Sequence, residues 1–220
     1  MNPALVGVAV AVVLGAVIAG SARNARTALF GLLLALLGAA FIADPLPDTL
    51  GLAGRLVGAV LGGYLLWIAG RGTDTRTDPR TGGSRLGWPT EVLIAAAAAT
   101  VGFGSHGLGA PATGPAAAQA AGFALAALAI APTLNGRDTL RVGIGLNLLV
   151  VGAILVRTGL GGTQEALEQL VVAGLLAMLG GAVAALAIAS RAEGATGFDL
   201  ELAPTERIRR PPDAHPIDLR

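Results

Sequence analysis

The stretch Pro3–Gly20, with the sequence PALVGVAVAVVLGAVIAG, consists of apolar residues and glycine and carries no charge. A helix needs about 20 mostly apolar residues to cross the hydrocarbon core of a bilayer. Further stretches of this kind follow, separated by charged or turn-forming residues: Thr27–Ala43, Leu50–Ala69, Glu91–Leu108, Pro115–Leu134, Thr139–Val156 and Glu165–Ser190. The sequence therefore predicts an all-α, polytopic membrane bundle of about seven transmembrane helices.

The composition favours the same class of protein. Of 220 residues, 54% are hydrophobic and 13% are charged, whereas soluble domains carry about 25% charged residues. The 15 basic residues are all Arg, and neither Lys nor Cys occurs, which excludes a Schiff-base lysine, disulfides and thiolate metal sites. The net charge of +1 argues against a nucleic-acid partner, which needs a strong basic excess.

The distribution of Arg predicts the orientation, because Arg in short loops stays on the cytoplasmic side. With the N-terminus outside, every Arg except Arg55 and Arg157 falls on the inner side. The Ala-rich fourth stretch is needed for this result, since its removal would place the later basic loops outside. Positive charge follows the first apolar run instead of preceding it, so that run is predicted to be a retained helix and not a signal peptide. We expect a multi-pass protein of a prokaryotic plasma membrane with a cytoplasmic C-terminus.

Loop composition divides the chain into five parts. They are a three-helix membrane unit (1–70), a polar cytoplasmic loop (71–90), a connecting helix with its outer loop (91–114), a second three-helix unit (115–191) and a disordered cytoplasmic tail (192–220). In each unit a helix ends at a short basic turn, at Arg23–Arg26 or at Arg137–Arg141, and a Gly-Leu step follows. An odd connecting helix gives both units the same orientation, so this pattern predicts a 3+1+3 parallel repeat.

Ionisable residues inside a membrane are costly, and each is a functional hypothesis. Arg55 lies about one turn into the third helix, where it is expected to snorkel to the outer surface or to pair with Asp44 or Asp48. Glu165 and Glu168 lie at the start of the seventh helix. The positive helix end alone explains two carboxylates there, and a proton or cation entry site is the alternative.

Arg157, in the same outer loop, is a candidate partner for these carboxylates. Asn147 and Gln119 are amides within apolar stretches, and each is predicted to bond across to another helix or, alternatively, to line a polar path. His106 has no second His or carboxylate at metal-ligand spacing, so we expect a solvated side chain at a helix end.

Gly54, Gly58 and Gly62 recur every four residues on the third helix. Such a stripe lets another backbone approach closely. It predicts a contact face, either within the bundle or against another membrane protein. The sequence contains no phosphate-cradling loop, no zinc-binding His pair and no evident Ser-His-Asp set. We therefore predict no catalytic, cofactor-binding or metal-binding residues, and not an enzyme.

Residues 122–191 resemble the small three-helix membrane subunit of bacterial complex I, which is related to the C component of Mrp antiporters and the E component of group 4 hydrogenases. The residues that carry the resemblance are the turn Asn135-Gly136-Arg137-Asp138, Leu140 and Arg141, the stretch Gly143-Ile144-Gly145-Leu146-Asn147-Leu148, and a final helix ending at Arg191. In that family a Glu of the proton path follows the Ile-Gly-Leu step, and a second Glu lies midway along the last helix. Here these positions are Asn147 and, nearby, Met178.

Because neither position titrates, the resemblance implies a scaffold or accessory subunit of an ion-translocating complex and not a carrier of the proton. One alternative is a small solute transporter, because 3+1+3 helices with the N-terminus outside is the layout of the sugar-transporting SWEET family. The Pro-Gln motif of that family is absent. A retinal protein is excluded by the absence of Lys, and a membrane protein of an uncharacterised family is the remaining alternative.

Overall fold

The computed structural model describes residues 2–22, 24–71, 87–108, 111–135 and 139–192. These residues form seven helices and no strand: α1 (Pro3–Ser21), α2 (Ala25–Ala39), α3 (Thr49–Gly70), α4 (Trp88–Gly104), α5 (Ala116–Asn135), α6 (Thr139–Gly161) and α7 (Ala166–Ala192). The all-α prediction is confirmed for this part of the chain. Most of the predicted loop, residues 72–86, and the predicted tail from residue 193 onward lie outside the described residues.

Five helices, α1, α3, α5, α6 and α7, are long and apolar enough to cross a membrane by length and composition. Helix α2 has 15 residues and α4 has 17, which is shorter than the usual span of about 20. The sequence predicted that α2 would continue to Ala43, and this boundary is wrong. Beyond Ala39 the amides of Ala40, Phe41 and Ile42 donate to carbonyl oxygens three residues back, so the chain leaves the α-helix in a tighter turn.

Two other helix ends differ from the prediction by about one turn, and a glycine follows each of them. Helix α4 ends at Gly104 and not at Leu108, because Gly107 adopts a positive φ of 76° in the following turn. Helix α6 continues beyond Val156 to Gly161, and Gly162 with φ 76° ends it. A left-handed glycine after the last turn is a common helix terminator.

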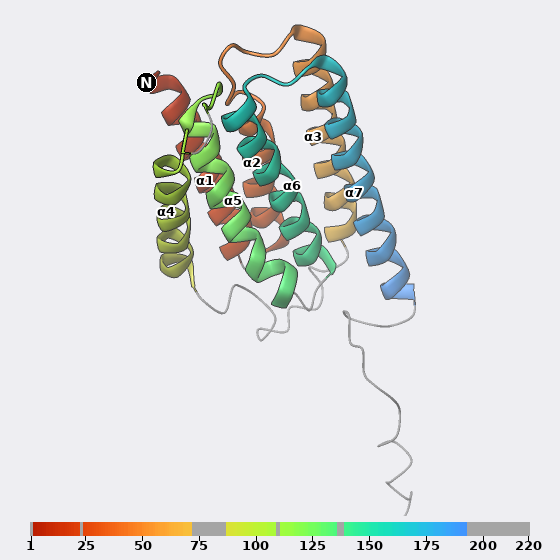
Figure 1. Ribbon diagram of the computed structural model, residues 1–220. Helices are drawn as coiled ribbons and strands as arrows, with labels where there is room; N and C mark the ends of the chain where they lie inside the picture. The colour runs from red at the N-terminus through yellow and green to blue at the C-terminus, as the bar shows by residue number, and fades with distance from the viewer. Residues whose placement is uncertain (1, 23, 72–86, 109–110, 136–138, 193–220) are drawn as a thin grey trace, which may run out of the picture.

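Six of the described helices form two layers, α1–α2–α3 and α5–α6–α7, in the same order (Figure 1). Each helix lies against its counterpart in the other layer, so that α1 contacts α5, α2 contacts α6 and α3 contacts α7. Helix α4 packs on α5 and α1 at one edge. We call the end of the bundle where α6 ends and α7 begins the outer end, and the opposite end the inner end.

Glycines bring the helix backbones into contact. On α6, Gly145, Gly152 and Gly159 recur every seven residues and all face α5. A Cβ atom at Gly152 would lie 2.9 Å from the carbonyl oxygen of Gly122, and one at Gly122 would lie 2.7 Å from that of Gly152. Such small-residue contacts are the usual means of close packing between membrane helices.

The Gly54, Gly58 and Gly62 stripe of α3 lies against α7 of the same chain. A Cβ atom at Gly58 would lie 2.6 Å from the Cα atom of Ala173, and one at Gly62 would lie 2.9 Å from the carbonyl oxygen of Leu176. A Cβ atom at Gly54 would lie 2.7 Å from Cδ2 of Leu170. Of the two occupants that the sequence allowed for this stripe, the structure places a helix of the bundle there.

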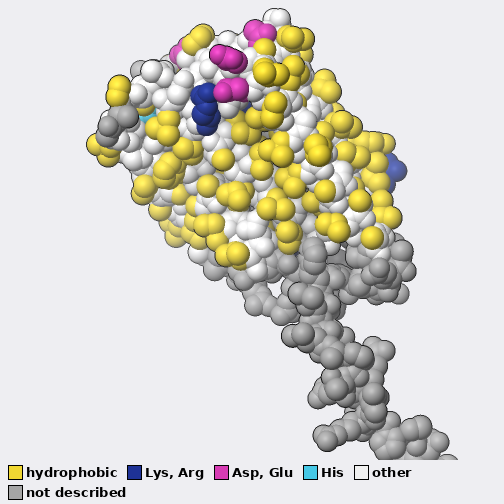
Figure 2. Space-filling view, turned by 45° about the vertical axis from the view of Figure 1, so that its right-hand side comes forward, with side chains coloured by type: hydrophobic (Ala, Val, Ile, Leu, Met, Phe, Trp, Pro, Cys, Tyr) yellow, Lys and Arg dark blue, Asp and Glu magenta, His cyan; other side chains and the backbone are white. Residues whose placement is uncertain are grey.

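Apolar side chains cover the outside of the bundle as well as its interior (Figure 2). Leu93 of α4, Leu167 of α7 and many other large hydrophobic residues are exposed. A soluble monomer rarely exposes extended apolar patches. An apolar exterior around apolar helices of membrane-spanning length is what a membrane protein requires.

Candidate functional site

A polar cluster lies at the outer end, between α6 and α7. Near the end of α6, Nη2 of Arg157 donates hydrogen bonds to both carboxylate oxygens of Glu168 in the first turn of α7, at 2.9 and 3.0 Å. The two side chains are 47% and 44% exposed. This is one of the pairings that the sequence suggested. Glu165 lies just before α7 and is exposed.

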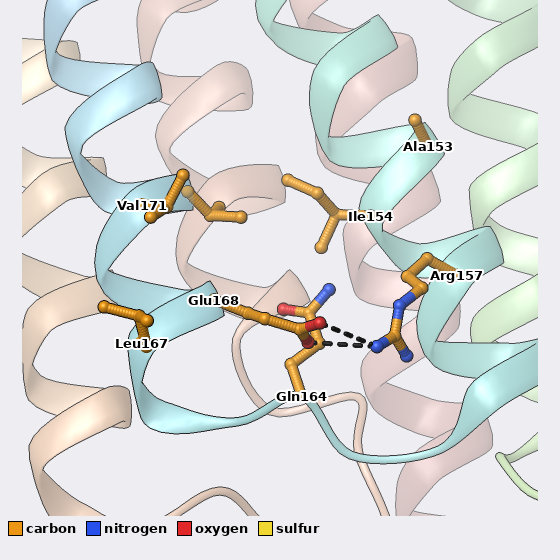
Figure 3. Close-up of a pocket in the computed structure, with 8 residues that line it drawn as sticks. Ala153, Ile154, Arg157, Gln164, Leu167, Glu168 and Val171 are labelled. Atoms are coloured by element: carbon orange, nitrogen blue, oxygen red, sulfur yellow. Dashed lines mark hydrogen bonds and ion pairs between the residues drawn. The ribbon is translucent and has the colours of Figure 1, made fainter.

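From this ion pair toward the inner end, a groove of about 460 Å³ runs between α6 and α7 (Figure 3). We call it the α6–α7 groove. It is lined by Ala153, Ile154, Arg157, Gln164, Leu167, Glu168, Val171 and Val172. Its walls are mainly apolar, and the ion pair crosses from one helix to the other (Figure 3). This arrangement accommodates a molecule with an apolar body and a charged end.

Two buried amides at the groove, Gln164 in its wall and Gln169 beside it, were not anticipated from the sequence. Nε2 of Gln169 donates to the backbone oxygen of Gln164 at 3.1 Å. The Oε1 atoms of both side chains are buried and lack a hydrogen-bond partner within the described residues. Gln169 also lies next to Gly51, where an added Cβ would come within 2.9 Å of its Oε1. The available signal was an uncharged polar residue in the first turn of an apolar helix.

Arg55 is 4% exposed, so the expectation that it snorkels to the surface is wrong. It forms no ion pair with Asp44 or Asp48 in the part of the chain described, and Asp48 instead caps α3 by accepting from the Gly51 amide at 3.2 Å. Arg55 follows Gly51 by one turn and precedes Gly58 by one turn. Gly51 and Gly58 contact α7, and Arg55 lies on the same face of α3. Its side chain therefore points into the bundle.

At the opposite edge Gln119 connects α5 to the end of α4. Its Oε1 lies 2.9 Å from Nδ1 of His106, and its Nε2 donates to Oγ of Ser105 at 3.1 Å. This is the cross-helix amide bonding that the sequence suggested for Gln119. His106 is half-buried and is not the solvated side chain that was expected, because Gln119 faces it across the helix contact.

Asn147 behaves differently from Gln119. Its side chain is fully buried in α6, and Nδ2 donates to the Gly143 carbonyl of the same helix at 2.9 Å. Oδ1 has no hydrogen-bond partner among the described residues. The expected bond to another helix is therefore absent from this part of the chain, because the amide folds back by one turn onto its own backbone.

At the inner end Arg141 of α6 holds the last turn of α1. Its guanidinium donates to the carbonyl oxygens of Gly20 at 3.3 Å and Ala22 at 2.9 Å. Glu91, in the first turn of α4, is buried beside Gly20. Sequence reasoning used Arg141 for orientation and Glu91 as a helix boundary, so it missed that both pack against α1.

Among the described residues there is no group of three or more His, Asp or Glu side chains placed to hold a metal ion. The chain matches no protein-family model, no curated protein and no solved structure.

Proposed function

We propose that this chain is a seven-span integral membrane protein that serves as a non-catalytic scaffold or accessory subunit of an ion-translocating membrane complex of the complex I, Mrp or hydrogenase type. The observation that supports the accessory role concerns the two positions where the resemblance implies proton-path carboxylates. Asn147 is fully buried and bonded to its own helix. Met178, which lies near the second position in a run without acidic residues, is 75% exposed on the outside of the bundle. Neither side chain titrates, so neither relays a proton.

The seven-span assignment adds α2 and α4 to the five helices that are long and apolar enough to cross a membrane. Both lie alongside longer neighbours, with α2 against α1 and α4 against α5 (Figure 1). Both also present large apolar side chains to the outside, such as Phe30 and Leu93. With the N-terminus outside, Arg71 and Arg141 lie on the cytoplasmic side, as the positive-inside rule favours.

The natural absence of Cys allows a direct test of this orientation. We expect a single cysteine at Thr113 to react with a membrane-impermeant maleimide in intact cells, and one at Ser84 to react only after permeabilisation. Because α4 alone separates the two positions among the helices, labelling of both from the same side would show that α4 does not cross the membrane. The reverse labelling would overturn the orientation.

The accessory role is tested by extraction in a gentle detergent through a tag on the C-terminal tail, followed by mass spectrometry. We expect proteins of an ion-translocating complex to co-purify in fixed stoichiometry. A lone homo-oligomer would overturn the proposal. In the purified complex Asn147→Leu should leave assembly and ion flux unchanged, and loss of flux with intact assembly would place Asn147 in a polar path instead.

A small solute transporter is the second candidate. It is favoured by the pairing of α1–α2–α3 with α5–α6–α7, since corresponding helices lie against one another in the same order (Figure 1). That arrangement supports two similar units joined by α4, the 3+1+3 layout. Uptake of radiolabelled sugar into proteoliposomes tests it, and the absence of saturable uptake would remove this candidate.

A further inference from the structure

The α6–α7 groove is open on the outside of the bundle. Its walls include Ala153 and Ile154 from α6 and Leu167 and Val171 from α7. Leu167 and Val171 are 72% and 64% exposed. The charged side chains in this region gather toward one end of an otherwise apolar face (Figure 2). In a bilayer the groove would therefore face lipid along its length.

The ion pair at the mouth retains hydrogen-bonding capacity. Within the described residues Arg157 uses Nη2 for both bonds to Glu168, while Nη1 and Nε donate no hydrogen bond. A guanidinium has five N–H donors, and a carboxylate has about four acceptor sites. Both side chains are about half exposed. Each is therefore able to bind a second charged group without breaking the existing pair.

The polarity of the groove follows the bilayer normal. Ala153 and Val172 lie one helical turn below Arg157 and Glu168, which corresponds to about 6 Å of depth. One turn deeper again, exposed Leu149 on α6 and Leu175 on α7 continue the apolar track. A charged rim above an apolar track is the complement of a phospholipid, with its headgroup at the interface and its acyl chain in the hydrocarbon.

We propose that the α6–α7 groove binds one phospholipid with a zwitterionic headgroup and a primary ammonium, of the phosphatidylethanolamine class. The phosphate accepts hydrogen bonds from Arg157, and the ammonium donates to Glu168. An acyl chain lies along Leu167, Val171 and Leu175. A headgroup with both charges matches a rim that already contains one cation and one carboxylate, whereas a purely anionic headgroup leaves the carboxylate side without a partner.

A lipid fits the groove better than a partner helix does. A helix with its side chains is about 10–12 Å across. A helix seated in the groove would meet the Arg157–Glu168 ion pair, in which Nη2 and Oε1 lie 2.9 Å apart between α6 and α7. A single acyl chain passes beside that bridge and needs no change in it. The groove volume of about 460 Å³ also lies in the range typical of small-molecule sites.

The test uses the full chain, delipidated in mild detergent and incubated with equal amounts of phosphatidylethanolamine, phosphatidylcholine and phosphatidylglycerol with identical acyl chains. Native mass spectrometry should detect one retained phosphatidylethanolamine, bound about tenfold more tightly than either other lipid, which is a step of about 1.4 kcal/mol. Choline has no N–H to donate, and phosphatidylglycerol has no ammonium. Equal retention of phosphatidylglycerol would overturn the proposed headgroup, and the absence of any retained lipid would overturn the site.

Groove-filling variants locate the lipid. Ala153→Trp should reduce the retained lipid about tenfold, whereas Ala96→Trp, the same change at an exposed position of α4, should leave it unchanged. Val171→Trp fills the groove from α7 and replaces Ala153→Trp if that variant does not fold. Retention by both groove variants at the level of the control would overturn the assignment. A polypeptide bound in place of lipid would do so as well.

This inference rests on the proposed membrane location but not on the accessory role. The two fail separately, because lipid retention is measured on the purified chain and complex formation on the extracted assembly. A lone homo-oligomer that retains phosphatidylethanolamine would remove the accessory role alone. If several different proteins co-purify but the isolated chain retains no lipid, only the lipid site is removed.

Discussion

Helix α6 has two neighbours in its own layer and packs against them in different ways. Toward α5 it presents Gly145, Gly152 and Gly159, and the two backbones touch along most of their length. Toward α7 it approaches closely near the inner end, where Gly143 meets Val183, and the outer half opens into the α6–α7 groove. Regularly spaced glycines close a helix contact, whereas facing branched side chains hold the helices apart and create a site.

The largest effect is expected from adding a side chain at Gly152, where the backbones of α5 and α6 are in contact. Gly152→Ala would place a Cβ atom 2.9 Å from the Gly122 carbonyl oxygen and 3.0 Å from the Ala126 backbone nitrogen. Since backbone cannot move aside cheaply, we expect a loss of about 2 kcal/mol in the free energy of unfolding, measured by SDS titration with tryptophan fluorescence.

Gly174→Ala on α7 is the matched control for this change. No atom lies within 4 Å of the position that a Cβ atom at Gly174 would occupy. Because Ala favours helix over Gly by about 1 kcal/mol, this variant should be unchanged or slightly stabilised. Equal destabilisation by Gly152→Ala and Gly174→Ala would contradict the sealed contact between α5 and α6.

The next largest effect is expected at the inner end of α6. Arg141→Gln removes the charge and both bonds to the carbonyl oxygens of Gly20 and Ala22 at the end of α1. A charged donor at a helix C-terminus contributes about 1–2 kcal/mol, and the same titration should show a loss of that size. Wild-type stability in this variant would mean that the bonds from Arg141 to the end of α1 do not stabilise the inner end of the bundle.

A smaller loss is expected where α6 approaches α7. Gly143→Ala directs a methyl group at the side chain of Val183 and not at backbone. Because α6 and α7 approach closely only near this end and are separated by the groove in the outer half, they can move apart slightly, and we expect a loss of about 1 kcal/mol. A loss as large as that of Gly152→Ala would show that the two contacts of α6 are equally rigid.

The smallest effect on stability is expected at the rim of the groove. Arg157→Gln breaks an ion pair that is nearly half exposed on both sides, and such pairs contribute about 0–1 kcal/mol. The SDS midpoint should therefore stay close to the wild-type value while lipid retention falls. A large drop in the midpoint would mean that the pair holds α6 and α7 together and does not primarily form a ligand site.

Several features were predictable because they depend on local sequence. The existence of the helices follows from apolar runs broken by charge and glycine. The pairing of Arg157 with a carboxylate of α7 follows from their places on either side of one short loop. The contact made by Gly58 was predictable as a small-residue face, but its partner α7 was not. The ends of α2 at Ala39 and of α6 at Gly161 required knowledge of the turn geometry.

The inward turn of Arg55, the bond of Asn147 to its own helix and the burial of Gln169 were not predictable from the pattern of residues. Each depends on how its helix is rotated about its own axis. In a soluble protein an apolar stripe reveals that rotation, because the opposite face is polar. These helices are apolar on all sides, so the pattern does not distinguish the face toward the bundle from the face toward the outside.

The sequence by itself determined the number and approximate extent of the helices and the acidic and basic character of their ends, because span length and charge placement are properties of contiguous residues. The tertiary structure alone decided which helices touch, that α7 covers the glycine stripe of α3, and that a groove remains beside α6. Lipid is as apolar as the protein interior, so hydrophobicity does not select these contacts. Shape complementarity between distant glycines and side chains selects them, and that exists only once the helices are assembled.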